Sequence, residues 1–291
     1  MLRIGDTVIE RVEEYLGPAF LARELLPDFD HGFVAEHRSW LVPTHYDQTT
    51  DQLIMSSHAW VLRTHGKVLL IDTCIGNGKS RPHSPMFHLA SFPFLDNLAA
   101  AGLAPEQVDF VLCTHLHADH VGWNTLQRNG RWVPTFPNAK YVFSRRDCEF
   151  FHWKNGPGAG DEDARNVFED SVLPTIESKQ DLQVDGVHDL GYGVTIEPSP
   201  GHSPGHVVIR VRTGREELLF SGDVLHHPIQ VHRPEWSSAF CADPEQSRQT
   251  RRRLLEQVAE RGSLLLPAHF AGDHACRIGA VAGRFVCLPP R

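Results

Sequence analysis

Short apolar runs bounded by turn residues recur along most of the chain. The run TVIERVEEY predicts a strand over residues 7–15, and AWVLRTHGKVLLIDT (59–73) predicts two strands that join at His65-Gly66. Further runs rich in apolar and β-branched residues predict strands within 108–114, 138–147, 193–200, 206–213, 217–223 and 263–270.

Helical patterns are fewer and lie between groups of predicted strands. Within residues 92–107 the pattern fits a helix that Gly102 closes, with Pro105 beyond it, and residues 146–154 fit a second, short helix. A longer helix is predicted to begin at Pro244, with Asp243 as its N-cap, and to end at Gly262. Helices therefore connect successive groups of strands, as in an α/β protein.

The order of these elements, β-β-α-β followed by β-β-β-α-β, indicates two similar halves in one domain that spans residues 1–291. Residues 16–50 are polar and aromatic with little periodicity, and we expect a loop or arm there, near the mouth of an active site. Arg251, Arg252 and Arg253 are expected to form a solvated face of the long predicted helix.

Composition and charge narrow the classes of function. The net charge of −8 disfavours nucleic acid and anionic membranes as partners. No apolar run approaches the roughly 18 residues that a membrane-spanning helix needs. The six cysteines include no CxxC pair, which disfavours a disulfide framework and a cysteine zinc site, so we expect a cytoplasmic protein with reduced thiols.

Histidine is the unusual residue of the composition, with 19 in all, and its densest cluster follows a predicted buried strand. In THLHADH (114–120), the alternate spacing of His115 and His117 places both imidazoles on one side of an extended segment. If the chain then turns into a helix at Asp119, this carboxylate and His120 face a neighbouring point. Crowding four such groups without a metal ion would be electrostatically costly, which favours a metal site.

Three further polar clusters also follow predicted strands and lie in turns. PSPGHSPGH contains His202 and His206, FSGDVLHH contains Asp223, and LPAHF contains His269. Three imidazoles and a carboxylate suit zinc or a similar divalent ion, and the remaining groups could serve a second ion. Two ions at the spacing known for hydrolases would hold a bridging hydroxide at neutral pH.

Other histidines and one glycine-rich turn carry no comparable pattern. CIGNGKS (74–80) is not a phosphate-binding loop, because the GxxxxGK[ST] spacing is absent. Seven isolated histidines are interpreted as surface or core residues without a role: His31, His37, His45, His58, His65, His152 and His232.

The combination of THLHADH, PGHSPGH, SGD and PAHF resembles the metallo-β-lactamase-fold hydrolase superfamily. The resemblance extends over nearly the whole chain, from HAWVLRTHGKVLLIDT to the last predicted strand. It implies an α/β fold, namely a four-layer αβ/βα sandwich of two mixed β-sheets flanked by helices, with a dinuclear metal site at one sheet edge.

The resemblance also implies roles for the clustered residues. His206 would not be a ligand, and Asp72 in LLIDT would orient a ligand imidazole. Two divalent ions per chain are expected, with Zn²⁺ as first choice and Mn²⁺, Co²⁺ and Fe²⁺ left open. The implied ligands are His115, His117 and His202 for the first ion, Asp119, His120 and His269 for the second, and Asp223 as the bridge.

Within this superfamily, the sequence looks most like the acyl-homoserine-lactone lactonases and the methyl parathion hydrolase-like enzymes. True β-lactamases of this fold lack a bridging aspartate where Asp223 stands, and this acidic chain has no basic arm like that of the tRNA-processing nucleases. The better-known lactonases have a tyrosine three residues after the bridging aspartate, where this chain has His226. The difference favours the relatives that cleave esters and organophosphates.

We therefore expect a dinuclear metal-dependent hydrolase that cleaves an ester, lactone or phosphotriester-type small molecule, with a metal-bridging hydroxide as nucleophile. Asp119 or His226 is expected to carry a proton to the leaving group. A hydrolytic dehalogenase or a thioesterase on the same fold is the alternative. A non-catalytic metal-binding protein is disfavoured because all seven ligands are present. A flavodiiron-like redox protein is disfavoured because it would usually have glutamate at the position of His117. The expected partner is a small-molecule substrate, with no nucleic acid and no membrane, and a homodimer is left open.

Overall fold

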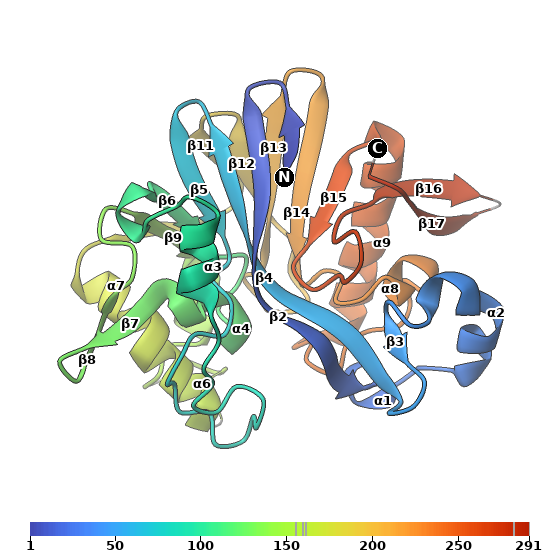
Figure 1. The fold of residues 1–291 in the computed structure, drawn as a ribbon, viewed down its shortest axis with the longest axis horizontal. Coiled ribbons are helices and arrows are strands. Elements are labelled where there is room, and N and C mark those ends of the chain that lie inside the picture. Colours follow the sequence, from blue (N-terminus) through green and yellow to red (C-terminus); the bar gives the residue numbers. More distant parts are fainter. Residues whose placement is uncertain (155, 159, 161, 282, 291) are drawn as a thin grey trace. The chain divides into compact units, whose positions relative to one another are not determined.

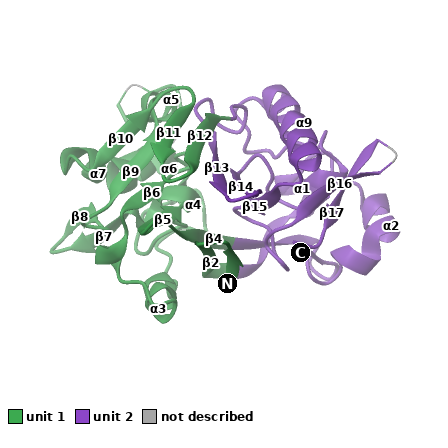
Figure 2. Cartoon of the chain, turned by 90° about the horizontal axis from the view of Figure 1, so that it is seen from above, with its two compact units in different colours: residues 1–15, 57–198 green, residues 16–56, 199–291 purple. Residues whose placement is uncertain are grey.

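The computed structural model describes residues 1–154, 156–158, 160, 162–281 and 283–290 (Figure 1). The chain divides into two compact units, each assembled from segments that are distant in the sequence (Figure 2). Unit 1 contains residues 1–15 and 57–198, and unit 2 contains residues 16–56 and 199–291. The sequence predicts a single domain over residues 1–291, and this stays a prediction. Residue 291 lies outside the described residues. Among the described residues, no helix is both long and apolar enough to cross a membrane.

Unit 1 is built on a mixed β-sheet whose strands are neighbours in the order β1-β2-β4-β5-β6-β9-β10. β1 pairs with β2 and β4 with β5 in antiparallel fashion, whereas β5, β6, β9 and β10 are parallel neighbours. The carboxyl ends of the parallel strands therefore meet at one edge of this sheet. The strands are Leu2–Ile4 (β1), Thr7–Leu21 (β2, in unit 1 as far as Tyr15), Gln52–Thr64 (β4, in unit 1 from Ser57), Lys67–Ile71 (β5), Phe110–Leu112 (β6), Lys140–Ser144 (β9) and Asp181–Val184 (β10).

Short helices and two hairpins complete unit 1. Apolar side chains of the helices and strands form one buried cluster, in which Phe94, Val111 and Phe168 are almost fully buried. The remaining elements are α3 (Phe94–Ala100), η1 (Pro105–Gln107), α4 (Ala118–Val121), η2 (Gly122–Asn124), β7 (Thr125–Arg128), β8 (Arg131–Pro134), α5 (Arg145–Phe150), α6 (Glu162–Val167), η3 (Phe168–Val172), α7 (Leu173–Glu177), β11 (His188–Gly191) and β12 (Val194–Pro198).

Unit 2 contains a strand group in which β13 (Val207–Thr213) pairs antiparallel with β14 (Glu216–Gly222), and β14 pairs in parallel with β15 (Leu264–Pro267). The start of β13 and the ends of β14 and β15 therefore lie at one edge of this group. The other elements of unit 2 are α1 (Ala22–Leu25), α2 (His31–Leu41), β3 (Tyr46–Asp47), α8 (Ile229–His232), α9 (Pro244–Arg261), β16 (Arg277–Val281) and β17 (Arg284–Leu288).

Helix α9 has the ends predicted from the sequence. The Asp243 side chain accepts a hydrogen bond from the backbone N–H of Gln246 at 2.9 Å, which satisfies a donor of the first turn. Gly262 ends the helix with φ +65°, a left-handed conformation that glycine adopts at little cost. The buried face of α9 includes Leu255 and Val258, which pack into the core of unit 2, and α9 lies beside β16 (Figure 1).

The two predicted halves are confirmed at the level of connectivity. In unit 1, the antiparallel pair β4–β5 is followed by α3 and then by β6, which is parallel to β5. In unit 2, the antiparallel pair β13–β14 is followed by the short α8, by α9 and then by β15, which is parallel to β14. Each half therefore carries its turn residues to the edge where parallel strands end.

The prediction of a loop or arm over residues 16–50 is wrong, because this segment forms helices and strands. β2 continues to Leu21, and α1, α2 and β3 follow, with Phe29 and Phe33 buried in a second core cluster of unit 2. Pro18 lies in the part of β2 beyond Ile9, which has one strand neighbour among the described residues, and proline within sheets is found mainly on such edges. The position of this segment near an active-site mouth stays a prediction.

The prediction that three arginines of α9 face solvent is wrong for one of them. Arg251 is fully buried, and its guanidinium donates to the carbonyl oxygens of Val224 (2.8 Å), Pro234 (2.7 Å) and Trp236 (3.1 Å). It ties the segment that follows β14 to α9. Arg252 is exposed as expected.

Candidate metal centre

The first polar cluster lies at the sheet edge of unit 1, where β5 and β6 end. Ile71 and Leu112 are direct partners in these parallel strands, so Asp72 and the residues after Leu112 leave the sheet side by side. Asp72 adopts φ +58°, which is strained for a residue other than glycine. Its carboxylate is thereby turned toward the THLHADH segment.

Asp72 holds this segment through three donors. Its carboxylate accepts the backbone N–H of Thr114 at 2.7 Å and the Thr114 hydroxyl at 2.8 Å. It also accepts Nδ1–H of His120 at 2.8 Å, which leaves Nε2 of that imidazole as a lone-pair donor. The orienting role expected for Asp72 therefore has a geometric basis in the structure.

A close backbone contact fixes the short helix α4 that carries Asp119 and His120. The His120 carbonyl accepts the N–H of Thr73 at 2.8 Å, and the Cys74 carbonyl accepts the N–H of Gly122 at 2.7 Å. A Cβ at Gly122 would lie 1.9 Å from the Ile75 carbonyl oxygen, so only glycine permits this approach.

The other side chains of the cluster converge on the same point in unit 1. Nε2 of His115 lies 3.0 Å from Nδ1 of His117, and the rings of His115 and His120 have centroids 4.0 Å apart. Asp119 Oδ1 lies 3.7 Å from Nε2 of His120. His115 and His120 are buried, whereas His117 and Asp119 are partly exposed. Unit 1 thus brings together all four residues that the sequence singled out in THLHADH.

The second cluster lies at the strand edge of unit 2. Asp223 follows β14 and His269 follows β15, its parallel neighbour. Asp223 Oδ1 lies 3.0 Å from Nε2 of His269, and Oδ2 lies 3.3 Å from Nε2 of His202. All three side chains are almost fully buried, so no bulk water screens these contacts.

The ring nitrogens in this cluster are suited to a cation. Nδ1–H of His269 donates to the carbonyl oxygen of Ser56 at 3.0 Å, so Nε2 presents a lone pair toward Asp223. Two acceptors 3.0 Å apart attract one another only through a shared proton or metal ion. The donor set of imidazole nitrogens and a carboxylate therefore fits a divalent ion such as Zn²⁺.

His206 touches Asp223 through the backbone. Its Nε2 accepts the backbone N–H of Asp223 at 3.0 Å, and its Nδ1–H donates to the Ser199 hydroxyl at 2.7 Å. Both ring nitrogens are used, and the ring is fully buried. His206 is therefore placed to hold the segment that carries Asp223, in keeping with the non-ligand role expected for it.

His226 points at the same carboxylate. Its Nε2 lies 3.2 Å from Asp223 Oδ2, and its ring centroid lies 4.8 Å from that of His202. Neither ring nitrogen hydrogen-bonds to any described residue, although the side chain is buried. The turn that carries it is held by Gln230, whose Oε1 accepts the backbone N–H of His226 at 2.7 Å. His202, Asp223 and His226 present ligand atoms within 4.8 Å of one another.

Sequence reasoning missed the residues that hold these side chains. Thr114, Ser199 and Gln230 form the hydrogen bonds described above. Thr114 and Ser199 lie inside motifs that the sequence analysis singled out, but neither was given a role, and Gln230 lies outside these motifs. Their role depends on which strands are neighbours, and no local pattern encodes this.

The family of the chain follows from a comparison of its sequence with known families. The profile of the metallo-beta-lactamase superfamily matches residues 54–269, well over half of the chain. The chain belongs to the metallo-beta-lactamase superfamily. The predicted family and its fold are therefore confirmed, and the matched range contains all the residues of both clusters.

Curated relatives in this superfamily include lactonases. The N-acyl homoserine lactonase of Bacillus cereus is 25% identical over 122 residues, which cover 42% of this chain and 40% of the relative. The N-acyl homoserine lactonase AttM of Azorhizobium caulinodans is 30% identical over 118 residues, which cover 39% of each chain. The match thus spans about two fifths of the length of these relatives.

Solved structures match over nearly the whole chain. Hydrolase AbOPH of the beta lactamase superfamily has a TM-score of 0.82 at 22% identity, with 99% of this chain and 96% of that chain covered. AidC, a dizinc quorum-quenching lactonase solved with a homoserine product, has a TM-score of 0.79 at 20% identity, with the same coverage. At these identities, both establish the fold.

Proposed function

We propose that this protein is a dinuclear metal-dependent hydrolase that cleaves an ester, a lactone or a phosphotriester-type small molecule. The observation that supports this most strongly is the chemistry of the two clusters. Each stands where parallel strands end, and each combines buried imidazoles with a carboxylate in an arrangement that suits a cation. The superfamily membership supports the same reading.

We propose that the two clusters together hold two divalent ions. Zn²⁺ is the first choice for this donor set, and Mn²⁺, Co²⁺ and Fe²⁺ accept it too. When bound, the ions would polarise the scissile oxygen and lower the pKa of a bound water so that hydroxide is available at neutral pH. The proposed ligands are His115, His117 and His202 for one ion, Asp119, His120 and His269 for the other, and Asp223 between them.

The protein's own contribution begins with the orientation of these ligands. The Asp72 carboxylate fixes the tautomer of His120, and the Ser56 carbonyl fixes that of His269, so Nε2 of each ring is the donor. His206 fixes the backbone of Asp223. Preorganisation of this kind lowers the reorganisation needed when the ions and the substrate bind.

Proton transfer to the leaving group is assigned to Asp119 or His226. Asp119 is partly exposed, so its carboxyl is accessible to a bound substrate. His226 is buried, and no described residue hydrogen-bonds to its ring nitrogens, so Nε2 is available to a reacting group near Asp223.

The substrate class is proposed from the relatives and from His226. Lactones are included because the curated relatives are lactonases. Esters and phosphotriesters are included because this chain has His226 where the resemblance leads us to expect a tyrosine in a lactonase. A hydrolytic dehalogenase or a thioesterase is the second candidate. We further propose a small-molecule substrate and a cytoplasmic setting, in which the free thiols stay reduced; five of the six cysteines are buried.

A hydrolysis panel tests the proposal. The protein is assayed on an acyl-homoserine lactone, an aryl ester, a phosphotriester and a thioester, as isolated, after chelation and after Zn²⁺ is restored. We expect hydrolysis of at least one of the first three, lost on chelation and regained with metal. No metal-dependent turnover on any of the four would contradict the proposal, and turnover of the thioester alone would favour the second candidate.

A further inference from the structure

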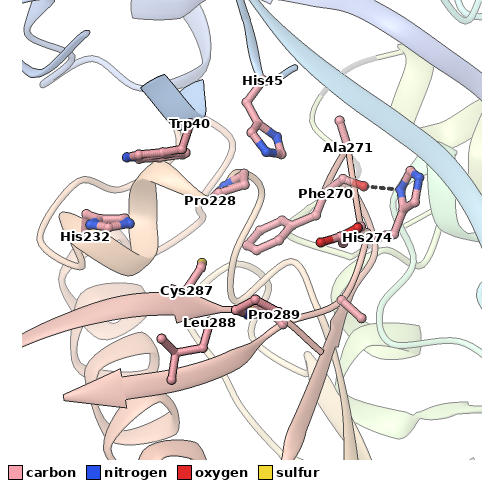
Figure 3. A pocket seen from close by; sticks show the side chains of 13 residues that line it. Trp40, His45, Pro228, His232, Phe270, Ala271, His274, Cys287, Leu288 and Pro289 are labelled. Carbon is pink, nitrogen blue, oxygen red and sulfur yellow. Dashed lines mark hydrogen bonds between the residues drawn. The ribbon is translucent and has the colours of Figure 1, made fainter. Parts of the chain in front are cut away.

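A cavity of about 320 Å³ lies within unit 2, and none of the proposed metal ligands lines it (Figure 3). Its wall combines segments that are far apart in the sequence: the end of α2, the loop after β15, and β17 with the residues that follow it. Trp40, His45, Phe270 and Leu288 are among the lining side chains. Phe270 directly follows His269, so the cavity adjoins a segment that carries a proposed ligand.

The wall is rich in flat rings. The Trp40 and His232 rings are stacked, with centroids 4.8 Å apart and an interplanar angle of 17°. Phe270 and His45 face the same space in Figure 3, and Leu288 and Pro289 add apolar surface. Such a wall favours a flat aromatic guest, since offset or edge-to-face ring contacts add to the burial of apolar area.

One polar atom on the wall has no hydrogen-bond partner among the described residues. Nδ1 of His45 is buried, while the backbone of the same residue is fully engaged. Its N–H donates to the Leu41 carbonyl at 2.8 Å, and its carbonyl accepts Nε2–H of His227 at 2.8 Å. The ring is thus presented from a fixed backbone, and a guest that hydrogen-bonds to Nδ1 would satisfy a buried polar atom.

The wall carries little charge. Burial lowers the pKa of His45 and of His232 to about 4, so both imidazoles are neutral at pH 7. A hydrogen bond with the Cys276 thiol, together with burial, raises the pKa of Cys287, so this thiol stays protonated. The Asp273 carboxylate also lines the cavity, but from a position that is exposed to solvent. The lining therefore favours an uncharged guest over an anion.

We propose that this cavity binds a flat, uncharged aromatic ring that contacts Trp40 and Phe270 and hydrogen-bonds through one polar substituent to Nδ1 of His45. A volume of about 320 Å³ is at the small end of ligand-binding pockets, which suits one ring or two fused rings. The ring could belong to the hydrolase substrate or to a separate small molecule, and the experiment distinguishes the two. The binding itself does not depend on the proposed hydrolysis.

The test is a binding titration with 2-naphthol and with 2-methylnaphthalene, which has the same shape but no hydroxyl, followed by ligand NMR on the full chain. We expect saturable binding at one site, with 2-naphthol favoured about fivefold, as one buried hydrogen bond would give. His45→Phe keeps the ring and removes Nδ1, so it should abolish this preference while 2-methylnaphthalene still binds. Trp40→Leu should weaken both ligands about fivefold.

The control variant is His83→Phe, an exposed histidine of unit 1, which should behave as the wild type. No saturable binding, or a preference for 2-naphthol that survives His45→Phe, would overturn the proposal. Tighter binding of 2-naphthoate or of a naphthyl trimethylammonium ion would overturn its uncharged character.

A second arm identifies the source of the ring. If the ring belongs to the substrate, 2-naphthol should inhibit aryl-ester hydrolysis competitively, and His45→Phe should relieve this inhibition. If it belongs to a separate molecule, 2-naphthol should bind without raising KM. Because binding is measured without turnover, failure of the hydrolase proposal would leave the binding result intact.

Discussion

The backbone N–H of Asp223 donates to Nε2 of His206 over 3.0 Å. Asp223 is the residue proposed to bridge two ions, and His206 is a buried histidine whose other nitrogen donates to Ser199. In this pair, metal binding and support of the backbone are therefore assigned to two different residues, although both lie in segments rich in histidine. One residue would hold metal, and the other holds that residue in place.

This separation predicts opposite effects for two alanine variants. Asp223→Ala removes the proposed bridge, so the second ion should bind more weakly and hydrolysis should fall by several orders of magnitude, while the melting temperature stays close to that of the wild type. His206→Ala should keep both ions but lose about 1–3 kcal/mol of stability, because the buried N–H of Asp223 loses its acceptor. Metal content, melting temperature and hydrolysis rate are measured together. Full activity in Asp223→Ala, or equal metal loss in His206→Ala, would contradict the ligand assignment.

Asp72→Asn tests the orientation of His120. An amide NH₂ facing Nδ1 of His120 would favour the tautomer with the proton on Nε2, which cannot bind metal. We expect metal affinity to fall by about 10- to 100-fold, as for other residues that orient ligand imidazoles. Asp96→Asn, on an exposed position of α3, is the control and should leave affinity unchanged. Equal affinities in the two variants would refute the role of Asp72.

Several features of this site could be predicted from the sequence because they are local. The strands end where apolar runs give way to turn residues, and the imidazoles of His115 and His117 come together shortly after β6. The ends of α9 follow from Asp243 and Gly262 alone. The clusters stood out because histidine and aspartate follow predicted strands.

Other features depend on contacts between distant segments and were missed. Residues 16–50 give no periodic pattern because the apolar side chains of short, kinked α2 pack against α8 and its neighbours rather than along one regular face. Arg251 is one of three consecutive arginines, so the sequence predicts an exposed side chain. Its acceptors, the carbonyls of Val224 and Pro234, come from segments distant in the sequence, so the sequence alone does not predict its burial. The sequence predicts no role for His45, because the cavity that it lines also needs Phe270, which is remote in the sequence.

Arg251→Met tests the burial of this arginine. The variant keeps much of the side-chain volume but leaves the carbonyls of Val224 and Pro234 without this donor. The Trp236 carbonyl loses one donor and keeps Nε2–H of Gln230. We expect a loss of about 3 kcal/mol or more in the free energy of unfolding, measured by urea denaturation. Arg252→Met, its exposed neighbour, should change stability by no more than about 0.5 kcal/mol. Similar losses for both variants would show that Arg251 has no special role.

Glu14 gives unit 1 a pH-dependent stability. Its buried carboxylate accepts Nε1–H of Trp123 at 2.7 Å and the N–H of Ile75 at 2.8 Å, yet burial raises its pKa from 4.5 to about 7. Between these values, the folded chain binds more protons at this site than the unfolded chain. Its contribution is therefore fully present below pH 4.5 and is lost as the pH rises through 7.

The comparison of wild type with Glu14→Gln isolates this contribution. The difference in their free energies of unfolding should shift against the wild type by about 3 kcal/mol as the pH rises from 4.5 to 8, at 1.36 kcal/mol for each pKa unit. Urea midpoints across this range provide the measurement. A difference that is independent of pH, or that grows in the opposite direction, would show that Glu14 remains ionised in the fold.

The number of metal ions in active protein tests the central claim most directly. Purified protein is saturated with Zn²⁺, freed of unbound metal and analysed for metal per chain, with the hydrolysis rate measured on the same sample. Seven ligands of these types should hold about two ions per chain, and activity should reach its maximum only as the second ion binds. One ion per chain in a fully active preparation would contradict the dinuclear centre.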